Sequence, residues 1–288
     1  MATGVEINRS NITLPAEVAR EILAQTQTDS AVMKLARKVN LPGRGLAIQA
    51  VTSDPQAAWV DETDEKPVSR PGLDTMTMQP YKLAVIVPFS NEFRRDADFL
   101  YEALVDRLPR ALAEKFDNTI VGSTAPGSNF TVLGSAQTQE IGTDTYDGLI
   151  AANKDIAENG GELNGFAIAP AGKATLLGAV DGSGRPLFIA NAAEGAIPYV
   201  LGAPVVIGKG VSDSTNNVVG IAGDWTQAMY GTVEGVKIDI SDQATLTDGD
   251  DTINLFQRNM FAVRAEIELG FVADADCFNL LTVTPAES

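Results

Sequence analysis

Carboxylates are the side chains that could carry chemistry in this 288-residue chain, because it has no histidine and one cysteine, Cys277. Without imidazole there is no Ser-His-Asp triad, no Cys-His pair and no histidine-ligated zinc site. Two acids facing each other across a cleft suffice for glycoside hydrolysis, so a carboxylate-dependent hydrolase stays open as an alternative. With 38 acidic residues, however, pairs such as Asp61-Glu62 or Glu266 and Glu268 carry little information. The last pair would point to one face of a strand.

The phosphate and metal motifs are incomplete. Gly172-Lys173 resembles the end of a P-loop, but Ala167 and Ala174 stand where the first Gly and the Ser or Thr belong. Gly208-Lys209-Gly210 lacks the third Gly of a dinucleotide-binding turn. Asp248 to Asp251 lacks the alternating ligands and closing Glu of a calcium loop. We therefore expect no catalytic residue, no metal and no cofactor, and read Cys277 as a small buried hydrophobe.

The charge balance disfavours a broad nucleic-acid-binding face. The chain has 21 basic residues and a formal net charge of −17, whereas phosphate binding needs clustered Lys and Arg. Residues 1–45 hold six basic and four acidic groups, so the net charge of −17 divides into +2 there and −19 in the rest. There is no signal peptide and no run of about 18 apolar residues. We expect a soluble protein synthesised in a cytoplasm.

Two short helices are predicted near the N-terminus, at residues 14–23 and 31–36. Pro15 suits the first turn of the former, and Arg37-Lys38 suits the end of the latter. Together they have too little apolar surface to fold alone. We interpret residues 1–45 as an arm that packs on another surface.

A long two-stranded ribbon follows. Residues 46–51 and 73–87 read as its strands, and the polar stretch 61–67 reads as its tip, after Trp59-Val60. Such a ribbon could project about 50 Å at about 3.3 Å per residue. Because an isolated ribbon is marginal in water, we expect it to lie on a neighbouring surface. The alternative is a hairpin folded back on its own domain.

The strongest helical pattern covers residues 90–122. Apolar residues recur every three or four positions, Ser90 and Asn91 can cap the start, and Gly122 marks the end. A helix of about 30 residues would be roughly 45 Å long and suits a structural spine. Pro109 is expected to kink or break it near Asp106.

The remaining pattern predicts an α+β fold of mixed order rather than a regular βαβ series. Residues 123–145 read as loop. Helices are predicted at 146–159 and 171–180, and strands at 166–169, 205–207, 218–222, 236–240, 261–269 and 278–283.

The order of these segments, over about residues 12–284, resembles the tailed-bacteriophage major capsid proteins of the Hong Kong 97 fold. The local motifs that carry the resemblance are Ala58-Trp59-Val60-Asp61-Glu62 with Lys66-Pro67, Pro88-Phe89-Ser90-Asn91-Glu92, Asn164-Gly165, Gly184-Arg185-Pro186, Leu201-Gly202-Ala203-Pro204, Gly223-Asp224-Trp225, Phe261 to Glu266 and Gly270-Phe271-Val272.

The resemblance implies a Hong Kong 97-like architecture in five parts. These are an N-terminal arm (1–45), an extended β-hairpin E-loop with its base (46–88), a peripheral domain with the spine helix (89–145), an axial domain (146–225), and the peripheral return strands with a final axial strand (226–288).

It also implies a structural protein of the virion, not an enzyme. Copies would assemble into pentamers and hexamers of an icosahedral head shell around a double-stranded DNA genome. A negative inner face would leave that DNA mobile. Expected partners are a separate scaffolding protein, since the arm starts almost at Met1, a portal protein and decoration proteins, with no membrane. An encapsulin, a protein compartment of the same fold, stays open as an alternative.

Candidate contacts between subunits lie in the arm, in the ribbon and before the spine helix. They are Leu14, Arg37, Lys38, Trp59, Asp61, Glu62, Lys66, Arg70, Arg94 and Arg95. Some family members crosslink their E-loop through a Lys–Asn isopeptide bond. Lys66 is the only lysine near the tip, but no Asn and Glu partners are identified for it.

Overall fold

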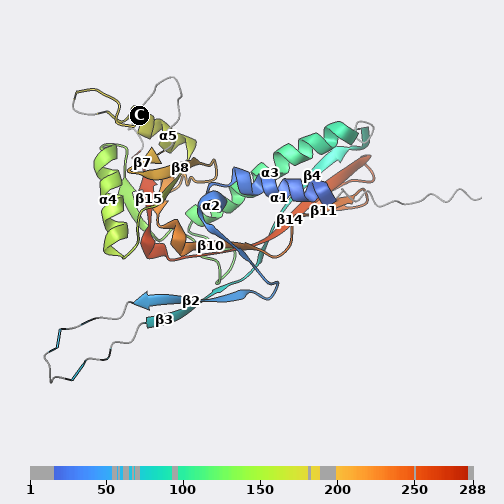
Figure 1. Cartoon of the computed structure of the whole chain (residues 1–288). Helices are drawn as coiled ribbons and strands as arrows, with labels where there is room; N and C mark the ends of the chain where they lie inside the picture. The colour runs from blue at the N-terminus through green and yellow to red at the C-terminus, as the bar shows by residue number, and fades with distance from the viewer. Residues whose placement is uncertain are drawn as a thin grey trace, which may run out of the picture.

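The computed structural model describes residues 16–53, 57, 59–60, 65–66, 68, 72–92, 97–180, 183–188, 199–249 and 251–284. Helices and sheets alternate irregularly along the chain, so the expected α+β class is confirmed (Figure 1). In this described part, no helix combines the length and the apolar character that crossing a membrane requires.

The larger sheet has five strands, two of which are longer than any strand of the second sheet described below. It is built around one long strand, β14 (Met260–Ala273). Strand β4 (Tyr81–Ser90) pairs antiparallel with it over Met260 to Leu269. The other strands of this sheet are β11 (Lys237–Ser241), β10 (Ala228–Thr232) and β1 (Arg37–Asn40), and β1 runs parallel to β10.

Helix α3 (Ala97–Val121) lies across one face of this sheet (Figure 1). Its buried residues Leu108, Leu112, Phe116 and Ile120 share a core with the odd-numbered residues of β14. The predicted spine helix is therefore present, but the predicted break is wrong. The helix continues through Pro109, which is itself buried, because loss of one backbone hydrogen bond is outweighed by this packing.

The N-terminal helices pack on their own chain. Helices α1 (Ala16–Asp29) and α2 (Ala31–Leu35) contribute Ile22, Val32 and Met33 to the core beneath α3. The arm was expected to pack on another surface. The structure shows that its helices pack on the spine helix of their own chain. Arg37 and Lys38, expected at a helix end, begin strand β1 instead.

The ribbon consists of β2 (Leu46–Ser53) and β3 (Gly72–Met78), which pair antiparallel and project away from both sheets (Figure 1). The single strand predicted over 73–87 is wrong, because the chain divides it at Gln79-Pro80 into β3 and β4. Proline cannot donate to a ladder, so a strand can change sheets at this point. At its base, Met78 packs on Leu41 and Val272.

A second sheet has six strands in the order β5-β15-β9-β6-β8-β7. They are β5 (Gln137–Glu140), β15 (Phe278–Thr282), β9 (Val218–Gly223), β6 (Gly165–Ile168), β8 (Ala203–Ile207) and β7 (Tyr199–Val200). Helices α4 (Thr145–Glu158) and α5 (Pro170–Gly178) pack on it through Leu149, Ile156 and Leu176. Both helices were predicted within two residues of their ends.

Several short elements were not predicted. They are β1, β5, β7, β10, the hairpin β12 (Thr245–Asp248) and β13 (Asp251–Asn254), and the 3-10 turns η2 (Trp225–Gln227) and η3 (Ala275–Cys277). Most are too short to establish an alternation of apolar and polar residues.

Candidate assembly surfaces

The ribbon tip exposes apolar side chains. Trp59 is fully exposed, at 104% of its reference area, and Val68 is 85% exposed. Glu65 and Lys66 beside them are also exposed. No described part of the same chain covers these side chains, and an exposed tryptophan at a projecting tip is typical of a contact with another molecule.

The four predicted contact residues that the structure describes fall in two separate parts of the chain. Arg37 and Lys38 are exposed on β1, at an edge of the larger sheet, whereas Trp59 and Lys66 are exposed in the segment between β2 and β3. The other six lie outside the described residues: Leu14, Asp61, Glu62, Arg70, Arg94 and Arg95.

A ladder of paired charges covers the face of the larger sheet that α3 leaves open. The Lys82 ammonium lies 2.8 Å from Glu266 and 3.4 Å from Glu268, and Arg264 lies 2.5 Å from Asp239. Glu266 and Glu268 do share one face, as their spacing predicted. Both lie beside Lys82 on an open sheet face. A glycosidase instead needs two acids that face each other across a cleft.

The electrostatics of this ladder are those of ordinary surface ion pairs. The hydrogen bond from Lys82 holds the pKa of Glu266 below its usual range, and the same bond raises the pKa of Lys82. These shifts keep Lys82 and Glu266 charged at neutral pH, so neither is poised to exchange a proton.

Two sequence motifs meet in a buried polar network around Asp224. Its carboxylate accepts hydrogen bonds from the Asn164 amide at 2.7 Å, from the Glu162 backbone N–H at 3.1 Å, and from the Thr226 hydroxyl and N–H at 2.6 and 3.0 Å. Asn164 in turn accepts from the Trp225 N–H at 2.8 Å. These donors outweigh burial and lower the pKa of Asp224. The network ties β6 to β9.

An aromatic contact completes this junction. The Trp225 indole donates to the Gly165 carbonyl at 2.9 Å and meets the Phe278 ring edge-on, with centroids 5.2 Å apart. A Cβ at Gly223 would lie 2.1 Å from the Phe278 ring, so only glycine fits there. Asn164-Gly165 and Gly223-Asp224-Trp225 are therefore structural motifs that join β15, β9 and β6.

A second buried carboxylate, Asp117 of α3, was not predicted. It is 1% exposed and accepts hydrogen bonds from the Ser30 hydroxyl at 2.5 Å and the Ala31 N–H at 2.9 Å. Burial raises its pKa to about 7. The sequence does contain a signal, since an aspartate in the apolar stripe of a helix must find donors.

The single cysteine, Cys277, is buried, as expected, and its thiol is unreactive. Burial is the largest cause that raises the pKa of the Cys277 thiol to about 11, and the nearby carboxylates of Asp274, Asp224 and Asp276 add to it. Such a thiol is protonated at neutral pH and is a poor nucleophile. Among the described residues, no three Cys, Asp or Glu side chains gather where they could hold a metal.

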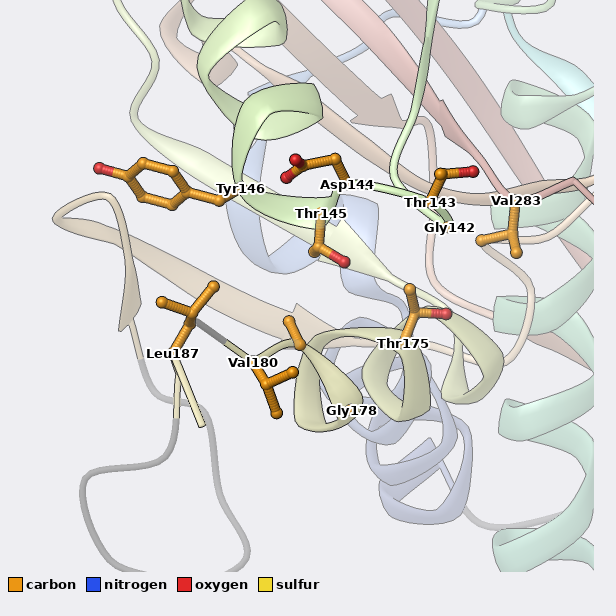
Figure 2. A pocket seen from close by; sticks show the side chains of 11 residues that line it. Gly142, Thr143, Asp144, Thr145, Tyr146, Thr175, Gly178, Val180, Leu187 and Val283 are labelled. Carbon is orange, nitrogen blue, oxygen red and sulfur yellow. The ribbon is translucent and has the colours of Figure 1, made fainter. Parts of the chain in front are cut away.

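A cavity of about 430 Å³ lies between α4 and α5 (Figure 2). Thr145 and Thr175 line it, and Val180 and Leu187 border it on the side of the loop after α5. Asp144 also lines it, but its carboxylate caps α4 by accepting from the Asp147 N–H at 3.3 Å. Among the described residues that line the cavity, there is thus no pair of acids that could act on a substrate.

Apolar side chains are also exposed after α5 and on or beside β7 and β8. Tyr199 is 65% exposed and Val180 is 55% exposed, and Leu187, Leu201 and Ile207 are each about 40% exposed. Sequence reasoning missed them, because they come from three separate segments. Large exposed apolar side chains of this kind are typical of contacts with another protein.

Comparison with known sequences finds phage capsid proteins in each case. A family model described as "Phage capsid family" matches residues 10–282. The chain is 32% identical to "Probable major capsid protein gp17" of Mycobacterium phage L5, over 93% of this chain and 89% of that protein. It is 25% identical to "Major capsid protein" of Staphylococcus phage 80alpha, over 92% and 83%.

Solved structures share the fold. A chain from Gordonia phage Cozz superposes with a TM-score of 0.70 at 20% identity, covering 89% of this chain and 87% of that one. A chain from Mycobacterium phage Adephagia also gives a TM-score of 0.70, at 19% identity, covering 90% and 91%. The expected fold is therefore confirmed by chains that differ widely in sequence.

Proposed function

The chain belongs to the phage capsid family, and from this membership we propose that its copies close into pentamers and hexamers around double-stranded DNA. It is a major capsid protein of the phage head shell and not an enzyme. The observation that carries the proposed mode of assembly is the projecting β2–β3 ribbon (Figure 1), together with the fully exposed Trp59 in the segment that joins its strands.

The ribbon supports contacts that run from each copy to the next. A two-stranded ribbon is marginally stable in water, so a tip with exposed Trp59 and Val68 gains stability by packing on another surface. When each copy extends a ribbon onto its neighbour, the contact is head-to-tail and closes into a ring. We assign Trp59, Asp61, Glu62, Lys66 and Arg70 to this contact.

The remaining candidates belong to other contacts. Arg37 and Lys38 are exposed at the sheet edge and fit contacts at the base of a neighbour's ribbon. We assign Leu14, Arg94 and Arg95 to contacts between subunits as well, on the basis of the family resemblance alone.

The parts of the chain take the roles that the resemblance implies. We assign residues 1–45 to the arm, 46–88 to the E-loop and its base, and 89–145 with the strands of 226–288 to the peripheral domain. We assign residues 146–225 and the final strand, which form the second sheet together with β5 of residues 137–140, to the axial domain around the five- and six-fold axes. The apolar side chains exposed after α5 and on or beside β7 and β8 fit contacts there.

The charge supports enclosure rather than tight binding of DNA. A net charge of −17 opposes adhesion of phosphates to the shell wall, so that the genome can be packed and released. We propose a scaffolding protein, a portal protein and decoration proteins as further partners, and assembly in the host cytoplasm.

The test is electron microscopy with mass measurement of the purified full chain, alone and with its scaffolding partner. The proposal expects closed shells of megadalton mass, and native particles that contain double-stranded DNA. A stable monomer under every assembly condition would contradict the shell. Closed native particles that contain protein cargo and no nucleic acid would instead support the encapsulin alternative.

A further inference from the structure

We propose that Asp117 is a proton-coupled positioning residue, which fixes the corner between α1 and α2 on the spine helix α3. The corner is formed by Asp29, Ser30 and Ala31, where α1 ends and α2 begins. This inference goes beyond shell formation, because it concerns how the folded subunit holds its own N-terminal helix.

The hydrogen bonds at the corner all converge on Asp117 and Ser30. One carboxylate oxygen accepts from the Ser30 hydroxyl at 2.5 Å, and the other accepts from the Ala31 N–H at 2.9 Å. The Ser30 oxygen accepts from the Met33 N–H at 3.0 Å, and the Ser30 N–H donates to the Thr26 carbonyl at 3.0 Å. Ser30 is thus bonded to α1, α2 and α3, and removal of Asp117 would release the corner from α3.

A glycine turn closes one side of the site. A Cβ at Gly208 would lie 2.7 Å from the Ala31 Cβ and 3.2 Å from an Asp117 oxygen. A Cβ at Gly210 would lie 2.3 Å from the Glu114 carbonyl oxygen. The close approach of this turn keeps the carboxylate dry, which is why Asp117 is 1% exposed.

The other side opens toward a cavity of about 780 Å³ between the corner, α3 and the glycine turn. Charged side chains from each packed element line it: Asp29 from α1, Arg107, Arg110 and Glu114 from α3, and Lys209 from the turn. Lys34 of α2 acts on Asp117 through its charge and favours ionisation. A proton can therefore reach Asp117 when the corner opens toward this cavity.

Burial decides the protonation of Asp117. It raises the pKa to about 7, against the hydrogen bonds from Ser30 and from the Ala31 and Val32 backbone and the Lys34 charge, which lower it. When the corner opens, water solvates the carboxylate and its pKa returns toward about 3.9. Closing the corner therefore takes up a proton between these two values.

The sign of the pH dependence follows from this difference. The closed corner is most favoured below about pH 4, and its advantage is lost as the pH rises toward about 7. Within this window the closing equilibrium changes by up to about tenfold per pH unit, and above it the equilibrium is level. Helix α1 is thus held more firmly in acid than at alkaline pH.

Hydrogen–deuterium exchange of the full chain tests this. Protection factors, corrected for intrinsic exchange at each pH, are measured for the α1 amides between pH 5 and 8.5, with the α4 amides as internal reference. The wild type is expected to lose α1 protection as the pH rises to about 7 and then to level off. Asp117→Asn, which cannot ionise, is expected to remove this slope. Asp251→Asn, at an exposed acid on strand β13, is the matched control and should keep it.

Ser30→Ala gives a second readout that a purely structural role would not produce. It removes a hydrogen bond that stabilises the ionised carboxylate, so the midpoint of the slope should move to higher pH. If Asp117→Asn does not fold, the direction in which Ser30→Ala moves the midpoint tests the proposal. A level wild-type profile, an unchanged slope in Asp117→Asn, or a midpoint unmoved in Ser30→Ala would overturn the proposal. Electron microscopy of the same samples reports shell formation separately, so the two proposals can fail independently.

Discussion

Asp117 and Asp224 are both buried and join separate elements through hydrogen bonds, and their surroundings shift their pKa values in opposite directions. Asp224 receives four hydrogen bonds, from Asn164, Glu162 and Thr226, and its pKa falls below the usual value. Asp117 is buried more deeply and has fewer such donors, so its pKa rises to about 7. The number of donors, weighed against burial, accounts for this difference.

Asp224→Ala is predicted to destabilise the folded chain by about 3 kcal/mol, because it leaves several buried donors without an acceptor. Asp274→Ala is the matched control. Asp274 caps η3 as Asp224 caps η2, but it accepts from the Asp276 N–H at 3.2 Å and interacts with the Cys277 thiol, without the amide and backbone donors of a second strand. We expect a loss of about 1 kcal/mol or less there. Urea unfolding of both variants measures the difference, and equal losses would contradict the role of the network.

The same variant has a defined pH dependence. Because the pKa of Asp224 is lowered in the folded state, its contribution to stability is present above the unfolded value of about 3.9 and is lost as the pH falls through the folded pKa. The destabilisation by Asp224→Ala is therefore predicted to shrink below about pH 4. Urea unfolding at pH 7 and pH 3 checks this, and a constant difference would argue against an ionised Asp224.

Cys277 is predicted to resist alkylation in the native protein. It is buried, and its thiol has a pKa raised to about 11, so very little thiolate exists at pH 8. We expect iodoacetamide to label it at least about a hundredfold more slowly in the folded chain than in urea. Mass spectrometry of timed samples provides the measurement. Labelling of the folded chain at the unfolded rate would show that the η3 turn is open.

At the scale of single residues, the sequence predicts which face of an element a side chain occupies better than it predicts which residue that side chain contacts. The two-residue spacing of Glu266 and Glu268 correctly predicted one face, because side chains alternate along a strand. The sequence did not predict Ser30 as the partner of Asp117, since 86 residues lie between them and only the packing of α1 and α2 on α3 brings them together.

At the scale of elements, close approach between layers depends on glycine. Gly210→Ala is predicted to destabilise the chain by about 2 kcal/mol, because its Cβ would lie 2.3 Å from the Glu114 carbonyl oxygen of α3. Gly178→Ala at the end of α5 is the matched control, as no atom lies within 4 Å of a Cβ there. Thermal unfolding compares them. Similar stabilities would mean that the turn can move away from α3 at little cost.

Helices and strands were both predicted with uneven accuracy: helix α1 ends at Asp29 instead of residue 23, whereas strands β9 and β15 were correct within one residue at each end. Helix α4 was correct within one residue at each end, because its apolar residues repeat at the helical spacing and Gly160 follows it. The strand over 73–87 was wrong, because its alternation continues across Gln79-Pro80 although the chain there moves from the ribbon to the larger sheet. Helix α3 continues through Pro109 for a tertiary reason, since its packing on β14 is not visible in local sequence.

At the scale of the whole molecule, the subunit combines two sheets with a ribbon that pairs with neither sheet and packs on the larger one at its base, through Met78 and Val272. Helices α4 and α5 share a core with the second sheet, and the core beneath α3 reaches from β14 into the second sheet through Ala167, Ile221 and Leu280. The order of segments was sufficient to predict this architecture through its resemblance to capsid proteins. The pairing of separate segments, such as β4 with β14 and β15 with β5, could not be predicted, because it depends on contacts distant in sequence.

The ribbon is predicted to be dispensable for folding and necessary for the shell. Replacing residues 54–71 with an Asn-Gly turn would join Ser53 to Gly72, which are paired at the end of β2 and β3. The base, with Met78 on Leu41, is retained. Phe256→Ser, which changes a 76% exposed aromatic residue elsewhere, serves as the control.

The most direct measurement is therefore negative-stain electron microscopy of wild-type, ribbon-shortened and Phe256→Ser chains under one set of assembly conditions, with circular dichroism of each. We predict closed shells from the wild type and the control, and a folded subunit that forms no closed shell when the ribbon is shortened. Closed shells of wild-type yield from the ribbon-shortened chain would contradict the central claim that the ribbon joins neighbouring subunits.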